Sequence, residues 1–223
     1  WHAMLLGQTS VPNNVRASFT IDQIGGRNGF DPNGIFLYGI PVVPGGYLGD
    51  TYLDSAWTAA GIELYKNGTT LKNLSARYDI QRNGLEVKVG REIRFLPGQE
   101  IKALSFTNSG EGMNFINAKE FDSNLSFLVQ ILAEGRATLL KQVQVTIKKS
   151  DYNQSLDIGS RYDKIIKNDF FYCWKDGQLT QLPKSQRKLK SKLIDLKILD
   201  PTASFRLKDE NSITDLFSNY NKD

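Results

Sequence analysis

Two residue types that carry much of enzyme chemistry are almost missing from this sequence of 223 residues. It contains one histidine, His2, and one cysteine, Cys173. Histidine is the usual general base near neutral pH and a common metal ligand. Because the single histidine lies at one end, a Ser-His-Asp triad, a His-rich metal site and a Cys-His nucleophile are all disfavoured. The residue types therefore disfavour an enzyme, although catalysis by carboxylates stays an alternative.

Carboxylates are the catalytic groups that remain available. A pair of them can hydrolyse a glycosidic bond, one as the acid and the other as base or nucleophile. The sequence does not say which carboxylates approach one another, so a carboxylate-dependent glycan hydrolase stays an alternative. The candidates are Asp50, Asp54, Glu63, Asp79, Glu86, Glu92 and Glu134.

Two further patterns are weaker. Ser185 and Lys188 have the spacing of a serine nucleophile activated by lysine, but the companion motifs are absent and Ser185 is explained as a helix N-cap. The loop with Asn28, Asp31 and Asn33 offers oxygen ligands of the kind that Ca²⁺ prefers. It lacks the calcium-loop motif and is better explained as a turn-rich loop. We therefore expect no catalytic residue, no metal and no cofactor.

Positive charge is concentrated in the last part of the chain, where residues 161–223 contain 13 basic and 9 acidic side chains. Arg187, Lys188, Lys190 and Lys192 spread over one side of a predicted helix, opposite its leucines, which is typical of a solvated face. Weak contact of these residues with an envelope protein or an anionic polymer is the alternative. Nucleic acid is not an expected partner.

Four aromatic side chains are the candidate ligand-binding residues: Tyr65, Tyr78, Tyr172 and Trp174. Strand alternation around them predicts mainly core packing. A concave sheet lined by these rings could also hold an apolar or carbohydrate ligand. A lipocalin-like carrier of a small apolar ligand is therefore a further alternative.

The elements that must position these residues are mostly strands. Alternating segments separated by turn dipeptides such as Asn67-Gly68, Asn83-Gly84 and Asp176-Gly177 predict antiparallel pairs. Strands are expected at 35–40, 62–64, 70–80, 85–89, 92–95, 100–106, 114–121, 126–133, 137–148, 163–167, 170–175 and 178–182, and helices at 186–196 and 211–220. The fold class is thus α+β and mostly β: about ten strands in an antiparallel up-and-down meander, barrel-like or as a curved sheet, followed by a C-terminal helical hairpin.

The ends of the chain suggest its organisation. Residues 1–7 form an apolar run that ends in Gly7 and resembles the tail of a secretory signal peptide, with a cloning scar as the alternative. Residues 8–183 form the β-rich body with a Gly/Pro-rich N-terminal segment, and residues 184–223 the helical hairpin. No window approaches the roughly 18 apolar residues of a transmembrane segment, so none is expected.

Several short runs also carry a resemblance. Residues 64–68, 77–80, 85–88 and 101–106 read LYKNG, RYDI, LEVK and IKALSF. In this order they resemble a group of exported β-rich proteins common in Bacteroidota that have no established function. The resemblance covers residues 47–223, including the aromatic strand at 170–174 and the terminal helices. It implies export and a β-rich fold, and it supplies no catalytic residues.

Together these observations predict an exported, non-catalytic protein of the bacterial envelope, periplasmic, outer-surface or secreted. We expect it to act as an interaction or accessory module through its β-body and its C-terminal helices.

Overall fold

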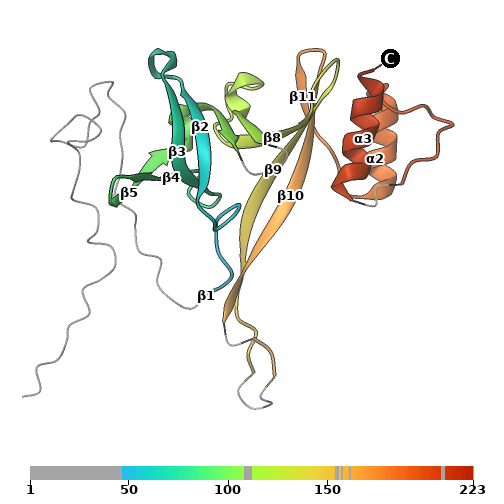
Figure 1. Ribbon diagram of the computed structural model, residues 1–223. Helices are drawn as coiled ribbons and strands as arrows, with labels where there is room; N and C mark the ends of the chain where they lie inside the picture. The colour runs from blue at the N-terminus through green and yellow to red at the C-terminus, as the bar shows by residue number, and fades with distance from the viewer. Residues whose placement is uncertain are drawn as a thin grey trace, which may run out of the picture.

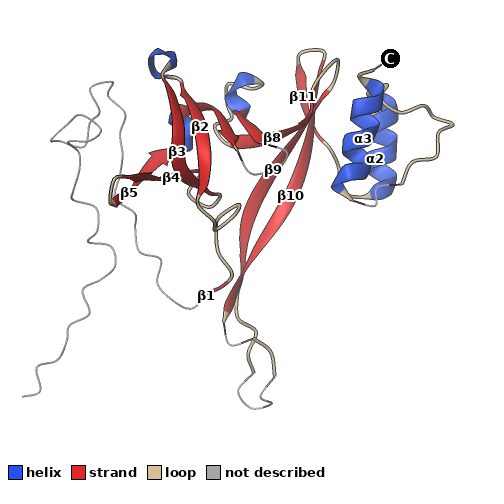
Figure 2. Ribbon diagram, in the orientation of Figure 1, coloured by secondary structure: helices blue, strands red, loops and turns tan. Residues whose placement is uncertain are grey.

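The computed structural model describes residues 47–107, 112–153, 156, 158–160, 162–206 and 209–222. They form one sheet of 11 strands with two α-helices beside it (Figures 1 and 2). The strands are β1 (Tyr47–Leu48), β2 (Thr58–Leu64), β3 (Thr70–Asp79), β4 (Gly84–Val89), β5 (Glu92–Pro97), β6 (Ile101–Phe106), β7 (Met113–Asn117), β8 (Leu128–Ala133), β9 (Thr138–Lys148), β10 (Asp163–Lys175) and β11 (Gln178–Gln181). The helices are α2 (Gln186–Asp195) and α3 (Glu210–Tyr220).

The mostly β, α+β fold class is confirmed, and the predicted turns are present. Asn67, Asn83 and Asp176 all have positive φ angles, of 56°, 46° and 51°. Asn and Asp tolerate this left-handed conformation better than most residues, which is why they mark tight turns. The expected strand at 35–40, the loop with Asn28, Asp31 and Asn33, and residues 1–7 lie outside the described residues.

The neighbour order of the strands departs from the predicted meander. It runs β1-β10-β9-β8-β7-β6-β2-β3-β4-β5, with β11 also on β10. β6 therefore pairs with β2 rather than with β5, which precedes it in the chain. The 3-10 turn Gly98–Glu100 carries the chain across to β2, and Asn117 fixes this crossing by donating to the carbonyls of Gly98 and Ile101, at 3.0 and 2.9 Å. The second departure is β1, which pairs with β10 in parallel.

The sheet is open but strongly curled, so strands that are distant in order share one core. Ile62, Leu85 and Leu104 lie in this core together with side chains of β3 and β5 to β8, and Val143 and Val145 of β9 pack against it. The described strands do not close into a ring, because β5 pairs only with β4 and the other margin ends at β10 with β1 and β11.

The side chain of Asn83 links two distant parts of the curled sheet at one end. The side-chain amide of Asn83, in the turn between β3 and β4, donates to the carbonyl of Ser126 at 2.7 Å. Its side-chain oxygen accepts the hydroxyl of Tyr78 at 3.1 Å. The turn is thereby held against the segment before β8.

The two helices pack on the sheet through one apolar stripe each. Leu189 and Leu193 of α2, and Ile213 and Phe217 of α3, are at most 1% exposed and join Leu139 of β9 in a second core. The four-residue spacing places each pair on one helix face. Asp209 and Ser212 form a capping box that starts α3. Neither helix, nor any other described helix, is long and apolar enough to cross a membrane.

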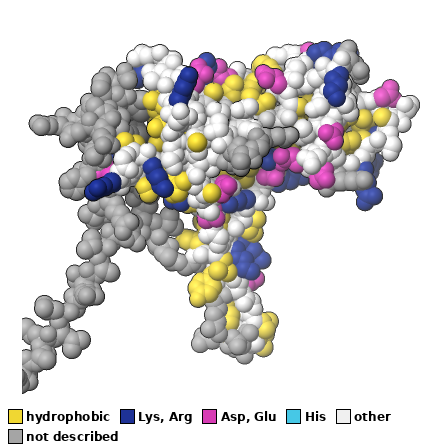
Figure 3. Space-filling model, viewed as in Figure 1, with side chains coloured by type: hydrophobic (Ala, Val, Ile, Leu, Met, Phe, Trp, Pro, Cys, Tyr) yellow, Lys and Arg dark blue, Asp and Glu magenta, His cyan; other side chains and the backbone are white. Residues whose placement is uncertain are grey.

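The far ends of β9 and β10 extend below the rest of the sheet as an arm, made of residues 146–148 and 163–166 and the described residues between them (Figure 1). Figure 3 shows hydrophobic side chains gathered on this projection. The large exposed apolar side chains of the described residues are Leu48, Leu156, Ile158, Tyr162 and Ile166, all on the arm or on β1 beside it.

Candidate functional site

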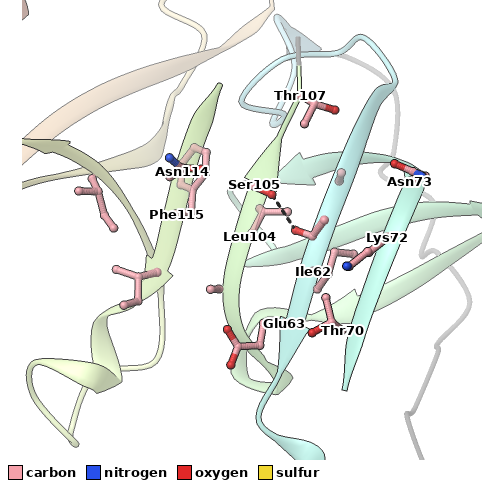
Figure 4. Close-up of a pocket in the computed structure, with 15 residues that line it drawn as sticks. Ile62, Glu63, Thr70, Lys72, Asn73, Leu104, Ser105, Thr107, Asn114 and Phe115 are labelled. Carbon is pink, nitrogen blue, oxygen red and sulfur yellow. Dashed lines mark hydrogen bonds between the residues drawn. The ribbon is translucent and has the colours of Figure 1, made fainter. Parts of the chain in front are cut away.

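A groove of about 530 Å³ crosses the face of β3, β2, β6, β7 and β8. Figure 4 shows Thr70, Lys72 and Asn73 of β3 on one side, Asn114 of β7 on the other, and Ser105 of β6 between them. This volume lies within the range of about 300–1,000 Å³ that is usual for ligand sites.

The floor of the groove is low because β2 has a glycine at its centre. A Cβ on Gly61 would come within 2.9 Å of the Ser105 hydroxyl oxygen. That hydroxyl instead contacts the carbonyl oxygen of Gly61 at 3.5 Å. A glycine inside a strand often marks a place where a ligand or another backbone approaches closely.

A β-bulge places two polar residues opposite this glycine. Ala60 pairs with Leu74 and Ile62 with Leu71, so Lys72 and Asn73 together lie opposite Gly61. Asn73 takes a positive φ of 56° within the strand, a conformation that costs free energy for residues with a side chain. Bulges of this kind re-aim side chains and are frequent beside functional sites.

A second bulge lies between Glu63 and Leu64, at the pairing of β2 with β6. It leaves Lys102 without a direct partner on β2, and the Lys102 ammonium binds the Glu63 carboxylate at 2.8 Å. The hydrogen bond to Glu63 raises the pKa of Lys102. The negative charge at this end of the groove is therefore already neutralised by the chain itself.

Apart from Lys72, the remaining polar side chains along the groove are short and uncharged: Thr70, Asn73, Ser105, Thr107 and Asn114. Each can both donate and accept a hydrogen bond. Ile116 and Ile131 form an apolar wall. Lys72 is exposed and supplies the one cation among the described lining residues. This arrangement can hold a polar ligand with an apolar side, but it offers Glu63 as its single carboxylate, so paired acid catalysis has no second acid in the groove.

Two of the three buried candidate carboxylates, Asp79 and Glu86, meet outside the groove, in an ionic cluster formed by Tyr52, Arg77, Asp79, Arg82 and Glu86. Glu86 is 0% exposed, and its Oε2 accepts the Arg77 Nε at 2.8 Å. Its Oε1 accepts the Tyr52 hydroxyl at 2.9 Å and also binds Arg82. Arg82 Nε reaches Asp79 at 2.6 Å. The structure thus brings Asp79 and Glu86 together, but around a shared guanidinium group rather than around an open space.

Aromatic rings complete this ionic cluster. The Arg77 guanidinium lies 3.9 Å from the centroid of the Tyr52 ring and 4.6 Å from that of Trp57. The Lys88 ammonium also lies over the Trp57 ring, 4.4 Å from its centroid. Cations over aromatic faces are attracted by the ring quadrupole, more strongly where water is excluded. These contacts hold the charges in place and leave them little freedom for chemistry.

The other candidate carboxylates are scattered. Asp50 binds Lys167 at 3.0 Å, Asp54 accepts the backbone N–H of Ala56 at 2.8 Å, and Glu92 lies 2.6 Å from Arg94. Glu134 is exposed beyond the end of β8. Within the described part of the chain, no group of three or more His, Cys, Asp or Glu side chains is placed to hold a metal ion.

The four aromatic residues proposed from the sequence lie in three places. Tyr78 is 5% exposed in the core of the curled sheet, where its ring lies 6.2 Å from that of Phe115. Tyr172 and Trp174 share a separate apolar cluster, in which Trp174 packs on Phe121. Tyr65 donates to Glu120 at 2.9 Å, and burial followed by this hydrogen bond raises its pKa. These rings do not line the groove, so their ligand-binding role stays a prediction.

The basic residues of α2 also differ among themselves. Lys190 donates to the carbonyl of Ala203 at 2.9 Å and so holds the segment between the helices. Lys192 is half-buried, whereas Arg187 and Lys188 are exposed. Ser185 occupies the N-cap position, as predicted, although its side chain makes no capping hydrogen bond. Ser185 is exposed, as is Lys188.

The sequence reasoning missed the groove itself. Two signals could have pointed to it: Gly61 in the middle of an alternating strand, and Lys72-Asn73 interrupting the alternation of the next one. Both patterns mark bulges or close approach. Ser105 and Asn114 carry no such signal, because their positions look like ordinary outward-facing strand residues.

Comparison with known protein families, with curated proteins and with solved structures found no match to this chain.

Proposed function

We propose that this chain is an exported binding module of the bacterial envelope, which holds its ligand in the groove and does not catalyse a reaction. The observation that carries the proposal is the groove over Gly61, with its floor, its two bulges and its row of neutral polar side chains. The neutralised Glu63 supports binding over hydrolysis, because an acid-pair mechanism needs two carboxylates beside the ligand. Export rests on the resemblance to exported β-rich proteins and on the N-terminal sequence.

The binding claim is tested by retention from envelope extract. Immobilised protein is incubated with envelope extract from the bacterium that encodes it, in parallel with Gly61→Val and Lys188→Glu. Valine at position 61 fills the floor without a backbone conflict, since Gly61 has no positive φ. We expect the wild type and Lys188→Glu to retain the same ligand and Gly61→Val to lose it. Equal retention by all three would contradict the groove as the binding face.

The other two parts of the proposal have their own readouts. Mass spectrometry of the retained ligand after prolonged incubation should show it unchanged, whereas a cleaved product would indicate catalysis. Fractionation of the native bacterium should place the chain outside the cytoplasm. A cytoplasmic location would refute export without touching the binding claim.

A further inference from the structure

We propose that the ligand of the groove is a segment of a glycan chain. This inference rests on the proposed function and specifies the chemical class of its ligand. The first argument is which hydrogen-bonding groups are available. The groove lies across strands that are paired on both sides in the sheet, so their backbone groups are used in the ladders. A peptide therefore cannot add a strand here, and the ligand must be bound by side chains.

The second argument is the kind of side chain. Asn73, Ser105 and Asn114 carry hydroxyl and amide groups that donate and accept at once. Sugar hydroxyls have the same dual character, so each can pair with such a group in either direction. The C–H face of a sugar ring is apolar, and Ile116 and Ile131 offer it an aliphatic wall.

The third argument is charge and shape. Since Glu63 is paired with Lys102, Lys72 is left as the charge available to a ligand. A nucleotide or phosphate-rich polymer would need several cations, and base stacking would need an exposed ring. The aromatic residue along the groove, Phe115, is 4% exposed and packs into the core. A neutral glycan, or one with an occasional carboxylate near Lys72, matches these groups best.

The test is an array of neutral and uronate-containing envelope oligosaccharides, probed with the fluorescently labelled full chain. For each oligosaccharide that binds, titration followed by NMR reports the side-chain NH₂ signals of Asn73 and Asn114. We expect both signals to shift, and the signal of Asn211 on α3, which does not line the groove, to stay in place.

Matched variants make the assignment specific. Asn73→Gly keeps the left-handed backbone conformation and removes the side-chain amide of Asn73. Asn114→Ala removes the side-chain amide of Asn114. Each variant should weaken oligosaccharide binding about 3- to 10-fold. Asn211→Ala is the control and should leave affinity unchanged. Lys72→Glu should weaken the binding of uronate-containing oligosaccharides more than the binding of neutral ones.

The outcomes separate this inference from the function on which it rests. No binding to any oligosaccharide of the array overturns the glycan assignment, and so does binding that Asn73→Gly and Asn114→Ala leave intact. If envelope extract then still yields a ligand that Gly61→Val loses, the module remains and its ligand is a protein or lipid. If no ligand is retained at all, the proposed function fails as well.

Discussion

The two halves of β3 use polar side chains in opposite ways. Its first half, with Lys72 and Asn73, faces the groove and keeps its hydrogen-bonding groups exposed. Its second half, with Arg77 and Asp79, enters the ionic cluster around the fully buried Glu86. The same strand therefore uses charged side chains for stability at one end and leaves polar side chains exposed along the groove at the other.

The contrast follows from burial. A charge removed from water must be paired and hydrogen-bonded, and breaking such a pair is costly because it leaves the partner uncompensated. An exposed ion pair contributes much less, since water and salt screen it. Residues in the cluster should consequently affect folding, and residues along the groove should affect binding.

The largest expected effect is that of Glu86→Ala. Removing this carboxylate leaves Arg77 and Arg82 without their shared partner, which should lower the free energy of unfolding by about 3–5 kcal/mol. Glu63→Ala breaks an ion pair whose side chains are 38% and 40% exposed, and it should cost less than about 1 kcal/mol. Urea denaturation of both variants gives the two values. Equal losses would break the comparison.

Tyr52→Phe should come next. The Tyr52 hydroxyl donates to Glu86 at 2.9 Å and accepts from Arg77 at 2.9 Å, so its loss should cost about 1–3 kcal/mol near neutral pH. The same denaturation measurement tests this, with Tyr162→Phe, an exposed tyrosine on the arm, as the control that should change little.

Tyr52 also makes stability depend on pH at the alkaline end. Burial, followed by the nearby Glu86 carboxylate, raises the pKa of Tyr52 from 10.0 to about 12. The folded state thus disfavours the phenolate, and this contribution is fully present below pH 10 and lost as pH rises toward 12. Stability measured across this interval should fall less steeply in Tyr52→Phe than in the wild type. An unchanged slope would show that Tyr52 titrates alike in both states.

The backbone conformation of Asn73 provides a further test of the comparison between the two halves of β3. Asn73→Ala keeps a Cβ at a positive φ of 56° without the amide, and it should destabilise the protein by about 1 kcal/mol. Asn73→Gly relieves the conformation and should be neutral or slightly stabilising. Thermal melts of the two variants test this ordering, and a more stable alanine variant would mean that the bulge is not strained.

The smallest effect should come from Lys72→Ala. Lys72 is exposed on β3, so the free energy of unfolding should change by no more than about 0.5 kcal/mol. A loss comparable to that of Tyr52→Phe would mean that the groove is part of the stabilising structure, and the proposed division of β3 would be wrong.

Local signals in the sequence predicted most elements because they act over a few residues. Asn83-Gly84 and Asp176-Gly177 determine their turns through the backbone, and Leu189 and Leu193 mark the buried face of α2. One of the exceptions is instructive: the sequence predicts a break between two strands at Asn168 and Asp169, but both continue β10, where they pair with Gln144 and Val143. Cross-strand partners overrode a weak local preference.

The ionic cluster and the groove both escaped prediction because each depends on partners that are distant in the sequence. Glu86 alternates with Leu85 and Val87 like an ordinary outward-facing residue, and only Arg77, Arg82 and Tyr52 make its burial tolerable. Likewise, no local pattern in the sequence predicts that β6 pairs with β2. Without that neighbour, Gly61 has no Ser105 next to it and the groove has no floor.

The crossing of β6 to β2 also sets when the site can appear during folding. Gly61 and Ser105 are 44 residues apart in the chain, so the intervening loop must close before the two strands meet. Hairpins such as β3–β4 need only local closure and can form earlier. A chain still emerging from the ribosome would therefore form its hairpins first, and the groove would be complete only once β6, β7 and β8 have cleared the exit.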